Sequence, residues 1–190
     1  MTAFGTLVSP GVVRFERLLP GPIERVWTYL TDPERRARWL AGGAMEPRVG
    51  GAVELRFRHE DLSPVIVPTP ERFAARTEVN LVHGTVTAWE PPRRLAFTWG
   101  EGGGRASEFT FELDAVGSEV RLTVTQRRLG DDPATWANVA GGWHTHLAIL
   151  EDRLRGRVPE PFFAAFEPIE AAYLERFVPA AGDAREGGES

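Results

Sequence analysis

Cysteine and lysine are both missing from this chain of 190 residues. The lack of cysteine excludes disulfides, thiolate nucleophiles and cysteine-type zinc sites. The lack of lysine excludes Schiff-base chemistry and a P-loop, which needs a lysine for the phosphates. Tyrosine is scarce, with two residues, whereas the chain has six Trp and eleven Phe. So many large apolar rings must be buried in a core or line a cavity.

Long hydrophobic runs are also missing. Because no run of about eighteen apolar residues occurs, the sequence predicts no membrane-spanning helix and no membrane partner. The first residues, MTAFGTLVSPGVV, lack the basic start and apolar run of a signal peptide, so we expect a cytoplasmic location. A net charge of −5 without a basic block argues against nucleic acid as a partner.

Alternation of apolar and polar residues predicts strands along most of the chain. Val53, Leu55 and Phe57 alternate with charged residues, which is typical of a half-buried strand. Short turn-forming links separate four further strand signals, so neighbouring strands should form antiparallel hairpins. One link is the glycine-rich segment 100–105, which joins two strands and is therefore interpreted as a turn and not a phosphate cradle. The predicted strands cover residues 12–19, 50–59, 80–89, 94–99, 106–115 and 119–129.

Helical spacing marks the two ends of the predicted domain. Two short helices are predicted at 22–31 and 33–40, with Asp32 as N-cap of the second. A long helix is predicted from Pro133 to about Leu154. Strands grouped together, with helices at the ends, favour the α+β class.

The remaining segments carry weaker signals. Residues 59–76 contain three prolines and are predicted to form a long loop, as a flap over an opening. Segment 161–177 places four apolar residues on one helical stripe, which we interpret as a docking face onto the domain or as a dimer contact. These residues are Phe162, Phe166, Ile169 and Tyr173. The tail 179–190 is predicted to be disordered.

Five segments in a fixed order resemble the START-like superfamily called SRPBCC. They are PIERVWTYLTDPERRARWL, VGGAVELRF, HGTVTAWEPPRRLAFTW, SEFTFELDAVGSEVRLTVTQRRL and GGWHTHLAILEDRL, and they cover roughly residues 12 to 155. Within the superfamily the chain is similar to bacterial single-domain members of the branch named after the activator of heat shock protein 90 ATPase. The resemblance implies a helix-grip fold, in which a curved antiparallel sheet wraps around a long C-terminal helix and leaves a cavity. The implied organisation is an N-terminal extension at 1–11, a helix-grip domain at 12–157, a packed helical extension at 158–178 and the tail.

The sequence WHTH at 143–146 raises the question of a metal or catalytic site. Residues two apart do not face each other on a helix, so His144 and His146 cannot clasp one metal as the i, i+4 pair of HExxH does. We therefore predict no metal site. His146 lies nearer the sheet-facing stripe, where it is either a hydrogen-bonded histidine at the rim of the core or a group that orients a ligand. His144 is expected to bond a loop or a strand edge.

Gly141 and Gly142 are unusual within a helix, since each costs nearly 1 kcal/mol against Ala. They could leave space for a ligand, permit close approach of a strand, or mark a kink or a later helix start. The sequence leaves these alternatives open.

Large apolar residues on the predicted inner faces are the candidates for a cavity wall. They would pack on one another in a solid core, but the resemblance implies a cavity between sheet and helix. The inner face of strand 80–89 stays open, so Val86 and Trp89 are not assigned. The predicted ligand-binding residues are Trp27, Trp39, Leu55, Phe57, Phe97, Trp99, Phe109, Phe111, Trp143, His146 and Leu150.

Three functional hypotheses follow, in this order. The first is binding of a small hydrophobic or aromatic molecule, without a cofactor and without established catalysis. The second is a cyclase- or hydrolase-like enzyme that uses His146 or His59 as acid or base, although no catalytic residue is assigned. The third is a co-chaperone-like or regulatory interaction module, or a homodimer, that uses the C-terminal segment around Phe162–Phe166.

Overall fold

The computed structural model describes residues 3–76, 80–100 and 106–178. The predicted turn at 100–105, apart from Gly100, and the predicted disordered tail therefore lie outside the described residues. Within the described part, no helix is long and apolar enough to cross a membrane.

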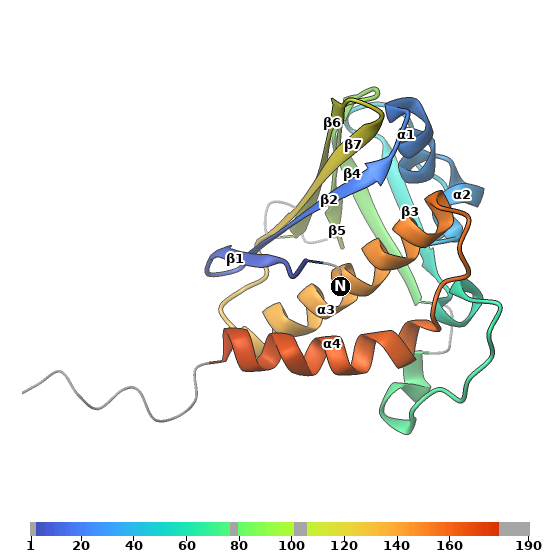
Figure 1. Ribbon diagram of the computed structural model, residues 1–190. Helices are drawn as coiled ribbons and strands as arrows, with labels where there is room; N and C mark the ends of the chain where they lie inside the picture. Colours follow the sequence, from blue (N-terminus) through green and yellow to red (C-terminus); the bar gives the residue numbers. More distant parts are fainter. Residues whose placement is uncertain (1–2, 77–79, 101–105, 179–190) are drawn as a thin grey trace, which may run out of the picture.

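One antiparallel sheet of seven strands, in the order β1-β2-β7-β6-β5-β4-β3, forms the framework of the described residues (Figure 1). Every predicted strand is present to within a few residues, which confirms the α+β class. One strand was not predicted, because the sequence indicated an extension at 1–11. There β1 pairs with β2 through a turn at Gly11, which has a φ of 72°. The strands are β1 (Thr6–Ser9), β2 (Val12–Pro20), β3 (Ala52–Phe57), β4 (Asn80–Glu90), β5 (Arg94–Trp99), β6 (Ser107–Val116) and β7 (Glu119–Arg127).

The helices begin where the sequence places capping residues. Helix α2 (Pro33–Ala37) follows α1 (Ile23–Thr31), and the Asp32 side chain accepts a hydrogen bond from the backbone N–H of Arg35. Helix α3 (Pro133–Leu154) starts in the same way, because Asp132 accepts from the N–H groups of Ala134 and Thr135. These carboxylates satisfy backbone donors that a helix start leaves unpaired.

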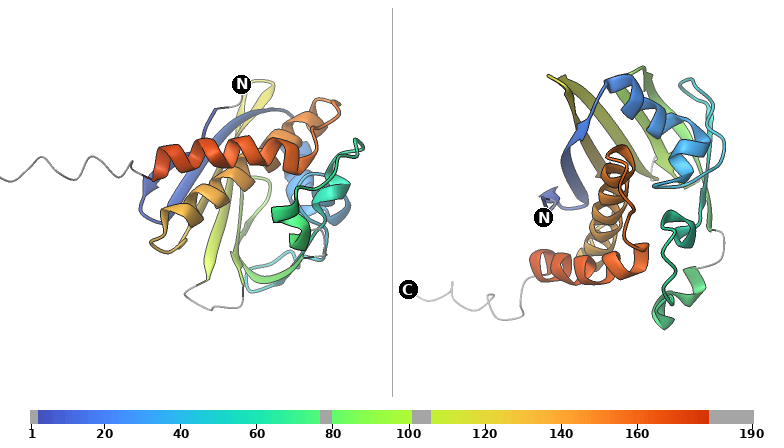
Figure 2. Two further views of the ribbon diagram at one scale, coloured as in Figure 1. Left: turned by 90° about the horizontal axis from the view of Figure 1, so that it is seen from below. Right: turned by 45° about the vertical axis from the view of Figure 1, so that its right-hand side comes forward.

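Helix α3 lies across the concave side of the sheet, and α4 (Phe162–Phe177) packs on the side of α3 away from the sheet (Figures 1 and 2). Three members of the predicted stripe on α4, Phe162, Phe166 and Tyr173, are buried, and Ile169 is half-buried. The stripe therefore docks onto the chain itself. The aromatic rings at 162–166 are not an exposed patch for a partner.

Segment 59–76, predicted as an irregular loop, contains two 3-10 turns, η1 (His59–Leu62) and η2 (Glu71–Arg76). It lies beside the start of α4 (Figure 2). The Ser63 hydroxyl donates to the carbonyl of Pro159, and an Arg153 guanidinium N–H donates to the carbonyl of Leu62. These two hydrogen bonds hold the segment against the helical layer. Its sequence shows neither a clear strand pattern nor a clear helix pattern.

Candidate functional site

A pocket of about 530 Å³ lies between the sheet, α3 and the start of α4. We call it the grip pocket. Its volume is within the range usual for small-molecule sites. Its wall combines strand residues, one face of α3 and two rings of α4. The lining residues are Leu40, Phe57, His59, Asn80, Trp99, Phe109, Gln126, Asn138, Val139, Gly142, Trp143, His146, Phe162 and Phe166.

The structure brings five of the predicted ligand-binding residues together in this wall: Phe57, Trp99, Phe109, Trp143 and His146. Their rings pack edge to face or tilted. Phe109, for example, lies 5.1 Å from Trp99 and 5.0 Å from Trp143 between ring centroids. Such contacts hold each ring in a fixed orientation. The wall is therefore preformed.

The other six predicted residues belong to the solid core and do not line the pocket. Trp39 is fully buried, and its indole N–H donates to the carbonyl of Tyr29. Trp27 packs edge to face on Trp89. Trp89, which the sequence left unassigned, therefore lies on the face of β4 toward α1. Trp27 lies in the core because its helix, α1, covers this end of the sheet by contacting β6 and β7. The remaining four, all buried, are Leu55, Phe97, Phe111 and Leu150.

The polar part of the wall was largely missed from the sequence. Gln126 on β7 and Asn138 on α3 carry no periodic signal, since neutral polar residues are common on surfaces. Gln126 accepts a hydrogen bond of 2.7 Å from the indole N–H of Trp143 and donates to the hydroxyl of Ser107. This pairing fixes the Trp143 ring and occupies the amide of Gln126.

His146 is a buried polar side chain of the pocket wall, with 6% of its surface exposed. Its Nδ1 lies 2.7 Å from the carbonyl oxygen of Trp39. A carbonyl can only accept, so Nδ1 carries the proton and donates. Burial, together with a smaller contribution from His59, lowers the pKa of His146 to about 3, and the bond to Trp39 opposes the shift. The ring is therefore neutral at pH 7, with Nε2 unprotonated.

His59 stands at the entrance, between the strand end and α4. Its ring centroid lies 4.2 Å from Phe162, 5.7 Å from Phe57 and 5.5 Å from His146. Together with the edge of α4, it separates the grip pocket from a second hollow of about 550 Å³ under segment 59–69. His59 is the one residue of segment 59–76 in the described lining of the grip pocket, and the flap role of the loop stays a prediction.

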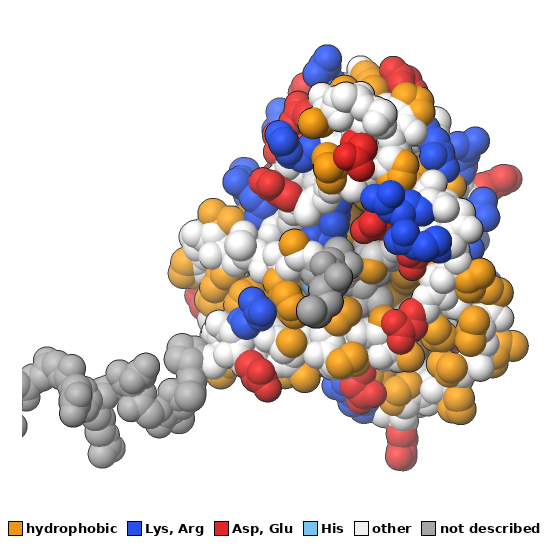
Figure 3. All heavy atoms as spheres, in the orientation of Figure 1, with side chains coloured by type: hydrophobic (Ala, Val, Ile, Leu, Met, Phe, Trp, Pro, Cys, Tyr) orange, Lys and Arg blue, Asp and Glu red, His pale blue; other side chains and the backbone are white. Residues whose placement is uncertain are grey.

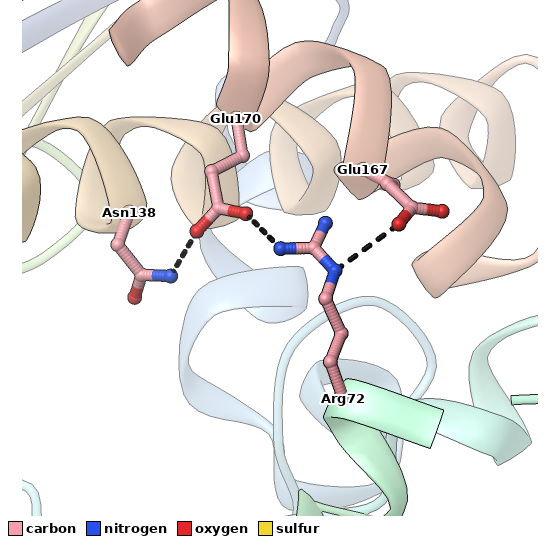
Figure 4. Close-up of polar contacts among 4 residues, drawn as sticks. All are labelled: Arg72, Asn138, Glu167 and Glu170. Carbon is pink, nitrogen blue, oxygen red and sulfur yellow. Dashed lines mark hydrogen bonds and ion pairs between the residues drawn. The ribbon is translucent and has the colours of Figure 1, made fainter. Parts of the chain in front are cut away.

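An ion-pair cluster connects this loop to both helices (Figure 4). The Arg72 guanidinium on η2 contacts Glu167 at 3.1 Å and Glu170 at 2.9 Å, both on α4. The amide of Asn138 donates to the other oxygen of Glu170. Since Asn138 also lines the pocket, the cluster connects the loop, α4 and the pocket wall.

The two glycines of α3 have different surroundings, and of the open alternatives only that of open space applies, to Gly142. A methyl group on Gly141 would meet Phe166 and Glu170 of α4 at 3.1 Å. A methyl group on Gly142 would meet nothing within 4 Å, and Gly142 lines the pocket. Gly141 therefore permits close approach of a helix, not of a strand, whereas Gly142 leaves open space.

His144 points away from the pocket. Its Nδ1 lies 3.1 Å from the hydroxyl of Tyr173, which accepts a 2.6 Å hydrogen bond from the N–H of Gly5. Its partner is thus on α4, whereas the sequence predicted a loop or a strand edge. Burial lowers the pKa of His144 to about 4, with further lowering by Arg17 and Arg176.

The grip pocket is suited to an uncharged apolar molecule. Among the described residues that line it there is no arginine, aspartate or glutamate. The described part of the chain contains no group of three or more His, Cys, Asp or Glu that could hold a metal ion. Aromatic rings supply most of the surface, and His59 and His146 are the ionisable groups of the wall.

Comparisons with known proteins agree with this fold. A family model described as Activator of Hsp90 ATPase homolog 1-like protein matches residues 20–155. A protein of Bordetella parapertussis, solved by NMR in solution, is 45% identical, with 90% of this chain and 89% of that chain covered and a TM-score of 0.76. No curated protein matches the chain.

Two more distant structures show the same fold. CalU16 from Micromonospora echinospora is 22% identical, with 85% of both chains covered and a TM-score of 0.60. The Aha1 dimer from Colwellia psychrerythraea is 15% identical, with 75% of this chain and 95% of that chain covered and a TM-score of 0.58. At these identities the likeness extends to the fold alone.

Proposed function

Because the chain belongs to the family of Activator of Hsp90 ATPase homolog 1-like proteins, whose model spans α1 to α3, we propose that it binds a small hydrophobic or aromatic molecule in the grip pocket. One observation carries the proposal: a cavity of about 530 Å³ whose described lining is mostly aromatic and contains no arginine, aspartate or glutamate. Removing about 250 Å² of apolar ligand surface from water would contribute about 6 kcal/mol before the costs of association.

The walls support binding more than acid–base chemistry. A catalytic histidine works best with a pKa near the operating pH. Burial lowers the pKa of His146 to about 3, so its ring is a weak base and is rarely an acid at pH 7. The enzyme hypothesis would then depend on His59 at the entrance.

A fluorescence titration with the neutral probe N-phenyl-1-naphthylamine tests the proposal. We expect saturable binding with one site per chain. Gly142→Leu should abolish it, because the new side chain would project into the space that the ligand occupies. Ala134→Leu places the same side chain at an exposed position of the same helix and should bind as the native protein does. Equal binding by both variants would refute the grip pocket as the site.

An exposed apolar segment supports a second candidate, self-association. Val65, Ile66 and Val67 are 49%, 96% and 40% exposed. Figure 3 shows hydrophobic side chains gathered at the lower right, where Figure 1 places segment 59–76. Contiguous exposed apolar surface often marks an interaction site. Sedimentation velocity should show a dimer that Ile66→Ser weakens; a native monomer at high concentration would refute this candidate.

A further inference from the structure

The polar side chains of the grip pocket differ in how many of their hydrogen-bonding atoms have a partner. The side chain of Gln126 is engaged through both its oxygen and its nitrogen. Asn138 donates its amide to Glu170. His146 uses Nδ1 for the carbonyl of Trp39. Among the described residues, no hydrogen bond reaches Nε2 of His146. His146 therefore presents to the pocket an acceptor that lacks a donor among the described residues.

This acceptor has a defined character because its tautomer is fixed. The hydrogen bond to Trp39 keeps the proton on Nδ1, and burial among Phe57, Phe162 and His59 disfavours a second proton. Nε2 is not among the described buried side-chain atoms without a partner, so it reaches the open space of the pocket. A ligand that covers it removes its access to water, and a covered acceptor without a donor costs free energy. A molecule that enters the pocket must therefore supply a donor at this point or suffer that cost.

The rest of the wall restricts the ligand further. No arginine, aspartate or glutamate is found among the described lining residues, so an ionised ligand would lose hydration without gaining a guanidinium or carboxylate counter-charge. The rings of Trp99, Phe109 and Trp143 offer faces and edges to a planar molecule.

Resting on the proposed function, we infer that the ligand is a neutral, aromatic molecule that carries a hydroxyl or N–H group, which donates a hydrogen bond to Nε2 of His146. The aromatic wall provides affinity for the apolar body of the ligand. His146 determines which end of it enters first and which derivatives are accepted.

Four ligands with the same ring system separate these requirements: naphthalene, 2-naphthol, 2-methoxynaphthalene and 2-naphthoate. Their dissociation constants are measured at pH 7 by isothermal titration calorimetry. We expect 2-naphthol to bind about tenfold more tightly than 2-methoxynaphthalene, which keeps the oxygen but has no donor. The ionised 2-naphthoate should bind the most weakly.

The His146→Phe variant should bind 2-naphthol and 2-methoxynaphthalene equally, because the acceptor is gone and the ring remains. His83→Phe is the matched control, since His83 is exposed on β4 and should leave the tenfold preference intact. Long-range ¹⁵N NMR of the native protein provides a readout that needs no variant. The Nε2 resonance of His146 should shift with 2-naphthol but not with 2-methoxynaphthalene.

The outcomes are distinguishable. Equal binding of 2-naphthol and 2-methoxynaphthalene by the native protein overturns the inference while leaving the proposed function intact. Tightest binding of 2-naphthoate also overturns it. If none of the four ligands binds, the proposed function itself fails, and the inference fails with it.

Discussion

The two faces of α3 differ although they are built from adjacent residues. Gly142 and His146 face a cavity, whereas Gly141 and His144 face α4 and the N-terminal segment. On one face Gly141 is in close contact with α4, and His144 is paired with Tyr173. On the other face there is open space and an acceptor without a donor among the described residues. A rotation of about 100° per residue thus separates a packing surface from a binding surface.

The histidines show the same contrast in their hydrogen bonds. His144 belongs to a chain in which the Gly5 N–H donates to the hydroxyl of Tyr173, and that hydroxyl is hydrogen-bonded to Nδ1 of His144. The Nδ1 atom of His144 thus has its partner within the chain. His146 is anchored at Nδ1 alone. Each prediction below changes one face and measures whether the other responds.

The largest expected effect is a loss of stability in acid. Both histidines have a pKa lowered by burial, to about 4 for His144 and about 3 for His146, against 6.5 in the unfolded chain. Below pH 6.5 the unfolded state therefore binds more protons, and the stability present above that pH is lost as pH falls. Each histidine should lower the free energy of unfolding by about 2 kcal/mol between pH 6.5 and 4.5, or about 4 kcal/mol together.

Urea unfolding at a series of pH values measures this loss. His144→Phe should remove its share of the loss in unfolding free energy between pH 6.5 and about 4. His146→Phe should remove its share between pH 6.5 and about 3. His83→Phe, at an exposed position, should leave it unchanged. Identical curves for all three variants would show that neither histidine is held neutral by the fold.

The next largest effect separates the two glycines. Gly141→Leu should lower the free energy of unfolding by about 3 kcal/mol, because Phe166 and Glu170 already lie 3.1 Å from the position of a Cβ. Gly142→Leu should leave it unchanged or raise it by up to about 1 kcal/mol through helix propensity. Urea unfolding of both variants decides the matter, and equal losses would contradict the assigned faces.

Removing the Tyr173 hydroxyl should have a medium effect on stability and none on the pocket. Tyr173→Phe leaves the N–H of Gly5 and Nδ1 of His144 without their partner, which should cost about 1–2 kcal/mol. Probe binding should not change. Urea unfolding and a probe titration measure both properties. A loss of probe binding would mean that the two faces are coupled.

The smallest effect on stability is expected at the cluster around Arg72. Its guanidinium is half-exposed, so Arg72→Gln should change the free energy of unfolding by about 1 kcal/mol or less. Amide hydrogen exchange should nevertheless become faster around Leu62 and Phe73, because the loop loses its link to α4. Arg94→Gln, which removes an exposed pair with Glu90, is the control. Unchanged exchange around Phe73 would show that the ring contacts with Phe163 hold the loop without the ion pairs.

Much of the fold could be predicted because its signals are local. Alternation specified the strands, and Asp32 and Asp132 specified two helix starts. The strand at 6–9 was missed because four residues carry too little periodicity, and its pairing with β2 decides the structure there.

The site was predictable only in part, since it depends on where elements meet. Periodicity places Phe97 and Phe109 alike on an inner face, yet only Phe109 reaches the pocket. Phe97 and Phe109 are register partners on β5 and β6, so the difference arises across the sheet, where Phe109 packs on Trp143 of α3. No local pattern contains this contact. Gln126 and Asn138 were missed for the same reason, because a neutral amide shows its role only after the fold brings it to a cavity.

The most direct test of the account is a crystal structure of the protein with 2-naphthol bound. The account predicts one molecule between Trp99, Phe109 and Gly142, with its hydroxyl about 3 Å from Nε2 of His146. A grip pocket filled by its own side chains, with the ligand outside the wall of α3, would contradict it.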